Sequence, residues 1–180
     1  MSARPALVAL EALAAQAGPP AIVRALCGQL WSLRETIAGL TADVYRAPQG
    51  RSSGSIGGHV RHCLDHVRAL FASGHELSYD SRLRGTRVET DPAAAIDELD
   101  RLLLALEDLD GGSLHAPVGL ATLIDHSGPV VRVLTTLGRE VAFVLQHTIH
   151  HCAIVAVLLE RSGIAVGPRF GYAPSTPHAH

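Results

Sequence analysis

The chain has 180 residues and a mass of 19.0 kDa, and 47% of its residues are hydrophobic while 18% are charged. A chain of this size builds one domain with its own core, and a formal net charge of -2 gives no field that attracts nucleic acid or anionic membranes. All 15 basic residues are arginines, and the lack of lysine excludes Schiff-base catalysis, a Ser-Lys dyad and a P-loop phosphate lysine.

Cysteine usage and hydropathy bear on the compartment of the protein. Cys27, Cys63 and Cys152 are odd in number and lack a CxxC spacing, which predicts reduced thiols and a cytoplasmic protein. The apolar run over residues 5–17 is interrupted by polar residues and is shorter than the roughly 18 residues that a membrane helix needs. We therefore expect no export signal and no membrane-spanning segment.

The first part of the chain predicts an extension followed by a helix. Residues 1–18 form an expected N-terminal extension whose composition is compatible with a helix. The first helix of the domain begins at Pro19-Pro20, because apolar residues recur with a helical period from there. The pattern fades at Thr41 to Tyr45, and a turn-rich stretch then leads to Ser55, a residue suited to an N-cap.

Two further helices are predicted in the middle of the chain. The second runs from about Ile56 to Ser73 and carries one apolar stripe. The polar stretch from His75 to Thr90 is expected to be a long ordered loop. Asp91-Pro92 combines an N-cap with a proline in the first turn and begins a third helix, which is expected to end at Gly111-Gly112.

The last part of the chain contains the clearest helix. Over residues 113–138 two β-branched runs bounded by Gly and Pro are compatible with a short hairpin or with irregular chain. The last helix is predicted from Arg139 to Arg161, and its apolar residues on all sides indicate a buried position. The fold class is therefore all-α, a bundle of four helices over residues 19–163, with a tail over residues 164–180 that packs on the bundle before it frays.

Six of the 11 histidines lie in two short stretches. In QHTIHHC of the last helix, His147 and His151 are four residues apart, so their side chains leave the same face one turn apart, a spacing at which two imidazoles can share one metal ion. His150 lies off that line. The neighbouring residues on this face are apolar, so we expect the imidazoles to be buried, where their ring nitrogens need partners.

The second group of histidines is the stripe of His59, His62 and His66 in GGHVRHCLDHV. It lies beside the apolar face of its helix, a geometry suited to facing another helix across a cleft, and one ligand from it completes a three-histidine site. A single helical histidine is more often hydrogen-bonded or exposed than a ligand. We assign that simpler role to the other five: His75, His115, His126, His178 and His180.

The type of ligand atom, an imidazole nitrogen, limits which metal ions the site can bind. Neutral imidazoles without thiolate or carboxylate ligands suit Zn, Ni, Fe(II) or Cu and are poor ligands for Mg or Ca. We expect one divalent ion, with Zn as the first choice and Ni or Fe(II) as alternatives. The HExxH motif is absent, since Thr148 occupies the glutamate position, and the paired Glu-x-x-His motifs of di-iron bundles are missing. Three ligands leave at least one coordination position open for water or substrate.

Several segments of the sequence resemble a known family. The segment SIGGHVRHCLDH and the closing QHTIHH are similar to motifs of the DinB-like, or YfiT-like, metal-binding bundles, and RVETDP and FGYAPST extend the similarity over most of the chain. The resemblance implies a four-helix bundle, frequently a homodimer, with one histidine ligand on the second helix and two on the last. Carried over by position, the ligands are His62, His147 and His151. Three others match no general ligand position, and we expect them to surround the site, with a role as metal ligand as the alternative: His59, His66 and His150.

The resemblance implies several activities without choosing among them. The superfamily includes thiol-dependent transfer and isomerisation with small bacterial thiols, domains that supply iron ligands in sulfoxide-forming enzymes, and proteins that resemble metal-dependent hydrolases. We expect a metal-dependent enzyme that performs hydrolysis or thiol-dependent transfer on a small molecule, with a low-molecular-weight thiol as a candidate partner and no nucleic-acid or membrane partner. The alternative is a non-catalytic metal-binding or ligand-binding bundle.

Other polar residues are candidates for supporting roles. Asp65, one turn from His62, and Glu140, two turns before His147, are placed to orient an imidazole or to carry a proton, although a surface carboxylate is the simpler interpretation of both. In the long loop, three side chains are candidates for contact with a substrate carboxylate: Tyr79, Arg82 and Arg84. An ion-pair cluster that fixes the loop is the simpler interpretation of these residues.

Overall fold

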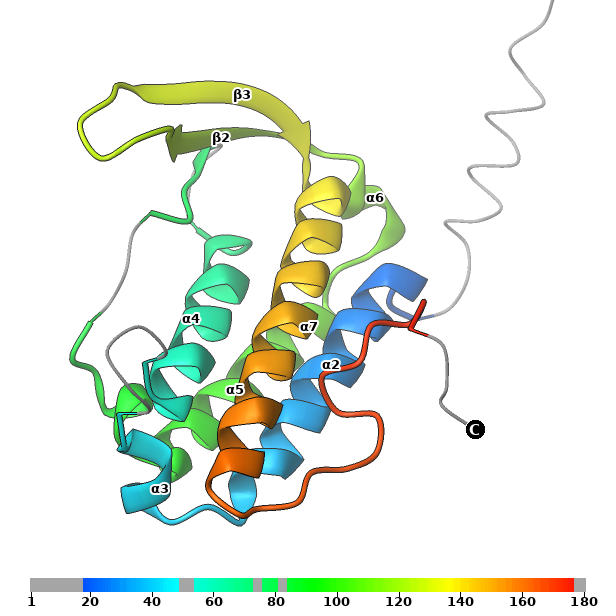
Figure 1. The fold of residues 1–180 in the computed structure, drawn as a ribbon. Coiled ribbons are helices and arrows are strands. Elements are labelled where there is room, and N and C mark those ends of the chain that lie inside the picture. Colours follow the sequence, from blue (N-terminus) through cyan, green and yellow to red (C-terminus); the bar gives the residue numbers. More distant parts are fainter. Residues whose placement is uncertain (1–17, 49–53, 73–75, 81–83, 177–180) are drawn as a thin grey trace, which may run out of the picture.

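The computed structural model describes residues 18–48, 54–72, 76–80 and 84–176, and the fold over these residues is mostly helical. Four long helices carry the core, and each packs against two others, α2 against α5 and α7, and α4 against the same two (Figure 1). Their bounds are α2 Ala21–Ala38, α4 Ile56–Ala69, α5 Pro92–Glu107 and α7 Leu137–Arg161. Leucine side chains from all four helices fill the space between them and are fully buried, for example Leu30, Leu64 and Leu99.

Local capping chemistry sets where three of these helices begin. The Ser55 side chain accepts a hydrogen bond from the backbone N–H of Gly58, and Asp91 accepts one from the N–H of Ala93 with Pro92 in the first turn, so both predicted starts are confirmed. Thr136 caps α7 in the same way. These caps satisfy backbone donors that the helices themselves leave open.

A three-stranded sheet corrects the all-helical expectation. Strand β2 (Pro117–Leu123) pairs antiparallel with β3 (Val130–Thr136), which is the hairpin alternative, and β1 (Glu76–Leu77) pairs parallel with β2. The β-branched content of both longer strands favours this arrangement over irregular chain. Because β3 ends where α7 begins, the sheet lies over one end of the long helices (Figure 1).

The long loop and several helix ends also differ from expectation. The stretch expected to be a loop contains β1 and the 3-10 helix η1 (Arg87–Glu89), elements too short for a periodic pattern to reveal. The fading pattern after α2 is a separate short helix, α3 (Ala42–Arg46), capped by Thr41. The Gly111-Gly112 pair begins α6 (Gly111–Leu114) instead of ending α5, because the Asp110 side chain accepts a hydrogen bond from the N–H of Ser113.

Helix α7 is the central element of the fold. By length and composition it is the single helix in the described ranges that could cross a membrane, but half of its most apolar 18-residue stretch is buried inside the protein. It packs against both α2 and α4, as the core helix of a folded domain does.

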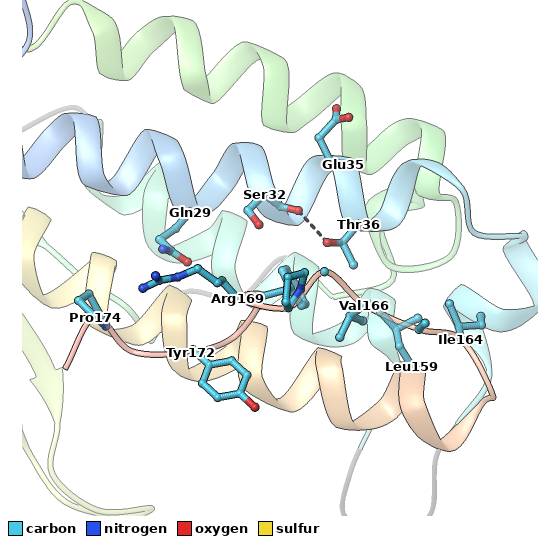
Figure 2. Close-up of a pocket in the computed structure, with 14 residues that line it drawn as sticks. Gln29, Ser32, Glu35, Thr36, Leu159, Ile164, Val166, Arg169, Tyr172 and Pro174 are labelled. Atoms are coloured by element: carbon cyan, nitrogen blue, oxygen red, sulfur yellow. Dashed lines mark hydrogen bonds between the residues drawn. The ribbon is translucent and has the colours of Figure 1, made fainter. Parts of the chain in front are cut away.

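The chain after α7 lies against α7 and α2. Phe170 inserts into the core, and Gly171 passes so close to α7 that a Cβ at this position would lie 2.6 Å from Cα of Ala153. The chain here also bounds a cavity of about 640 Å³ against α2, in which Arg169 extends toward Gln29 (Figure 2). Residues 1–17 and 177–180, which belong to the expected extension and to the end of the tail, lie outside the described residues.

Candidate metal centre

Three imidazoles from two helices converge between α4 and α7. His62 comes from the middle of α4, and His147 and His151 come from successive turns of α7. One ring nitrogen from each residue lies within 4.8 Å of one from each of the others, and Nε2 of His62 is 2.9 Å from Nε2 of His147. We call these three residues the histidine triad.

The packing of α4 against α7 explains why the triad forms. His62 is flanked on α4 by the buried Cys63, and His151 is flanked on α7 by the buried Cys152. Each of these cysteines enters the apolar core, and because adjacent helical residues point about 100° apart, the neighbouring histidine is turned to the edge of the helix contact. All three triad residues are accordingly half-buried.

Electrostatics keeps at least one member of the triad neutral. The pKa of His151 is lowered to about 3, first because burial disfavours the charged ring and then because His62, His147, His59 and His150 surround it. At neutral pH this imidazole is therefore uncharged, which is the form that binds a metal ion.

The donor set fits a divalent transition metal. Imidazole nitrogens bind such ions at about 2.0–2.1 Å, which places two ligand nitrogens roughly 3 to 3.5 Å apart, close to the 2.9 Å between the Nε2 atoms of His62 and His147. The position that carries a glutamate in zincins is Thr148, which is fully buried, and its hydroxyl has no hydrogen-bond partner among the described residues. The zincin arrangement is therefore absent at this site.

The other three clustered histidines surround the triad. Nδ1 of His59 lies 2.9 Å from Nδ1 of His151, and the His66 ring stacks on the ring of His147 with centroids 4.2 Å apart. Nδ1 of His66 donates a hydrogen bond to the backbone carbonyl oxygen of His62. His150 is exposed and its ring centroid lies 5.3 Å from that of His151.

Two candidates from distant parts of the sequence meet beside His66. The Tyr79 hydroxyl donates a 2.9 Å hydrogen bond to Oε2 of the fully buried Glu140, and the Tyr79 ring stacks on His66 at 4.9 Å between centroids. Burial raises the pKa of Tyr79, and the hydrogen bond to Glu140 raises it further. Glu140 also accepts hydrogen bonds from Thr135 and Arg139.

Thr135 and Phe143 are residues that the sequence did not single out. Thr135 lies on β3 and holds Glu140, while the ring of Phe143 stacks at 5.6 Å from the ring of His147. Phe143 stands four residues before His147 on α7, a spacing that places both rings on one face and offers a usable signal in the sequence. Thr135 has no such signal, because its position follows from the hairpin.

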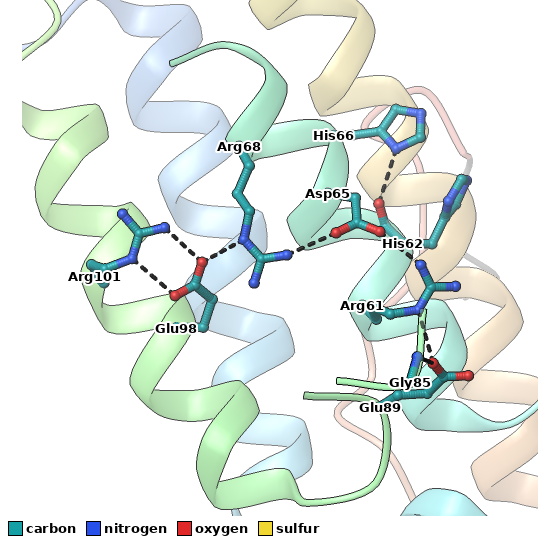
Figure 3. A network of polar contacts seen from close by, with 9 residues as sticks. All are labelled: Arg61, His62, Asp65, His66, Arg68, Gly85, Glu89, Glu98 and Arg101. Carbon is teal, nitrogen blue, oxygen red and sulfur yellow. Dashed lines mark hydrogen bonds and ion pairs between the residues drawn. The ribbon is translucent and has the colours of Figure 1, made fainter. Parts of the chain in front are cut away.

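The carboxylate of Asp65 makes its described contacts with arginines. It accepts from Arg61 and Arg68 at 2.7 Å each, and the network continues from Arg68 to Glu98 on α5 (Figure 3). Asp65 is buried, with 8% of its surface exposed. Its predicted role as a proton carrier beside His62 stays a prediction, and its contacts tie α4 to α5.

Of the two candidate arginines of the loop, the structure describes Arg84. Arg82 is outside the described residues. Arg84 is exposed and lines a cavity of about 640 Å³ together with Asp80 and residues 123–126 of the hairpin. The contacts predicted for these arginines with a substrate carboxylate stay untested.

Comparison with known protein families shows to which family the chain is related. The model of the DinB superfamily matches residues 30–155, a span that contains the whole histidine triad. The chain belongs to the DinB superfamily. This DinB-superfamily chain is also 33% identical over 101 residues to FK506-binding protein 5 of Rhizopus delemar, covering 56% of the chain and 26% of that protein. It thus spans about a quarter of the length of this curated relative, and no solved structure matches it.

Proposed function

We propose that this protein binds one divalent transition metal ion through His62, His147 and His151 and uses it in a reaction on a small molecule. The observation that carries the proposal is the approach of two Nε2 atoms from separate helices to 2.9 Å, with a third imidazole within reach. Zn is the first choice, and Ni or Fe(II) are alternatives, because the donor set is made of neutral nitrogens.

Three protein ligands leave room for a substrate. An ion held by three imidazoles keeps an open coordination position and supplies a Lewis acid that lowers the pKa of bound water or of a bound thiol. The half-buried triad supports access of a small molecule to this position.

Of the two reaction classes, we favour thiol-dependent transfer over hydrolysis. Hydrolysis by a water nucleophile benefits from a protein base. The two carboxylates that the sequence offers for this role are engaged, Glu140 by Tyr79, Thr135 and Arg139, and Asp65 by two arginines. A thiol is far more acidic than water, so its activation on a metal needs no such base.

Cobalt substitution tests this proposal. Protein loaded with Co²⁺ is titrated with mycothiol, bacillithiol and glutathione, and the visible spectrum is followed for a new sulfur-to-metal band. We expect a saturable band with at least one thiol in the wild type and none in His147→Ala. A spectrum that no thiol or change of pH perturbs would indicate a closed coordination sphere and contradict an enzyme.

A second candidate is a non-catalytic metal-binding module. It is supported by the position of the triad, since an ion bound there ties α4 to α7. In that case Zn²⁺ would raise the melting temperature strongly while neither water nor a thiol would exchange at the ion.

The remaining expectations concern assembly and compartment. We propose that the four long helices form the four-helix bundle of the family and that the protein is a cytoplasmic homodimer without nucleic-acid or membrane partners. The exposed Trp31 on α2 and Leu104 on α5 line an apolar pocket, and exposed apolar surface of this kind supports the proposal of a dimer. Light scattering after size exclusion tests the dimer, and Leu104→Glu should weaken it.

A further inference from the structure

His59 stands next to the histidine triad without belonging to it. It lies one turn before His62 on α4, and its Nδ1 is 2.9 Å from Nδ1 of His151. The two rings are tilted by 38° with centroids 5.1 Å apart, a geometry in which the ring nitrogens face each other. The group of side chains whose ligand atoms lie mutually within 4.8 Å contains His151 but not His59.

The chemistry of imidazole restricts how this contact can be made. A neutral imidazole carries one proton, so one of its nitrogens donates and the other accepts or binds a metal. Two Nδ1 atoms at hydrogen-bond distance therefore need one donor and one acceptor. If His151 binds an ion through Nε2, its proton resides on Nδ1, and His59 has to be the acceptor.

We propose that His59 is a positioning residue that accepts a hydrogen bond from Nδ1–H of His151 and thereby presents Nε2 of His151 to the metal ion. The inference rests on the proposed metal site and adds the residue that sets the tautomer and ring orientation of one ligand. Ligand histidines in metalloproteins usually donate the N–H of their second ring nitrogen to an acceptor outside the coordination sphere, most often a carboxylate, a backbone carbonyl or water, and loss of the acceptor costs roughly 10- to 100-fold in metal affinity.

The first turn of α4 and the chain before it place the His59 ring beside His151. Ser55 caps the first turn of α4, in which His59 lies, so the backbone there is well defined. A Cβ at Gly54 would lie 3.7 Å from Nε2 of His59, so the backbone at Gly54 passes beside the edge of the ring opposite Nδ1. The His59 ring thus lies between the backbone at Gly54 and Nδ1 of His151.

Two substitutions separate the hydrogen bond from the bulk of the side chain. Asn places an oxygen acceptor at the same number of bonds from Cα as Nδ1, whereas Leu fills similar space without an acceptor. Zn²⁺ affinity is measured by competition with a chromophoric chelator. We expect His59→Leu to bind about 10- to 100-fold more weakly and His59→Asn to recover most of the affinity. The exposed His126→Leu serves as the matched control and should bind as the wild type does.

The outcomes separate this inference from the proposed function. A wild type that binds no divalent ion overturns both. Wild-type affinity in His59→Leu, or an equal loss in the Leu and Asn variants, overturns the positioning role alone.

Nitrogen NMR of the Zn-loaded wild type adds a readout that depends on no variant. We expect His151 to carry its proton on Nδ1 and His59 to carry its proton on Nε2. A proton on Nδ1 of His59, or a nitrogen of His59 bound to the ion, would overturn the inference.

Discussion

Tyr79 and Glu140 are joined by a 2.9 Å hydrogen bond that connects the chain after α4 to the first turn of α7. Glu140 is fully buried, and its charge is matched by Arg139 and by the hydroxyls of Tyr79 and Thr135. The Tyr79 ring stacks on His66, so the same residue that anchors the loop also forms one wall beside the triad.

Removal of the Tyr79 hydroxyl should destabilise the protein. Tyr79→Phe keeps the ring and its stacking but takes one donor from a buried carboxylate, and we expect the free energy of unfolding in urea to fall by about 1.5–3 kcal/mol. Tyr172→Phe, at an exposed tyrosine, is the control and should have no measurable effect. Equal stability of Tyr79→Phe and the wild type would show that the hydrogen bond is unimportant.

Asp65 should prove to be a structural carboxylate. Asp65→Asn leaves Arg61 and Arg68 without their shared charged partner, and loss of a buried ion-pair partner typically costs about 3–5 kcal/mol of stability. We expect this loss in urea unfolding together with an unchanged Zn²⁺ affinity of the folded protein, while Asp97→Asn on the exposed side of α5 changes neither. A selective loss of metal binding would instead support a role of Asp65 in orienting the imidazole of His62 or in carrying a proton.

The metal-free protein should lose stability as the pH falls from about 6.5 toward 3. The pKa of His151 is lowered from 6.5 to about 3 in the folded state, so on acidification the unfolded state takes up a proton first. The contribution of this group to stability is therefore complete above pH 6.5 and is lost progressively as the pH falls below it. One such group contributes a slope of at most about 1.4 kcal/mol per pH unit. Chemical unfolding between pH 7 and 5 should show a smaller slope in His151→Gln and an unchanged slope in His126→Gln; identical slopes in all three proteins would contradict the assignment.

Gly57 should be intolerant of a side chain, in contrast to Gly28. A Cβ at Gly57 would overlap the carbonyl oxygen of Glu89 and lie 2.6 Å from Cε1 of Tyr45, so Gly57→Ala forces α4 away from η1 and should cost about 1–3 kcal/mol or more. At Gly28 in α2 no described atom outside the backbone of the helix itself and the two neighbouring residues lies within 4 Å of the added carbon, and Gly28→Ala should stabilise the helix by about 0.5–1 kcal/mol. Thermal unfolding measures both, and a stabilised Gly57→Ala would show that the two elements do not pack so closely.

Features that depend on nearby residues could be predicted from the sequence. The one-turn spacing of His147 and His151 follows from helical periodicity, and the caps Ser55 and Asp91 follow from side chains that accept hydrogen bonds from adjacent backbone groups. The all-round apolarity of α7 likewise indicated its central position.

Features that depend on distant partners could not be predicted. Strand β1 has two residues, and it forms because Glu76 and Leu77 pair with Gly119 and Leu120 far along the chain. The bond between Tyr79 and Glu140 also joins distant segments, so the sequence suggested each residue without suggesting that they meet. Periodicity within one element carries no information about such pairs.

The metal content of purified protein, measured for the wild type and for His62→Ala and His147→Ala, tests the central claim most directly. Each variant removes one nitrogen of the pair that lies 2.9 Å apart, and His115→Ala provides a control at an exposed histidine. We expect one divalent transition metal ion per chain in the wild type and in the control, and a large loss in both triad variants. One ion per chain retained by both triad variants would contradict it.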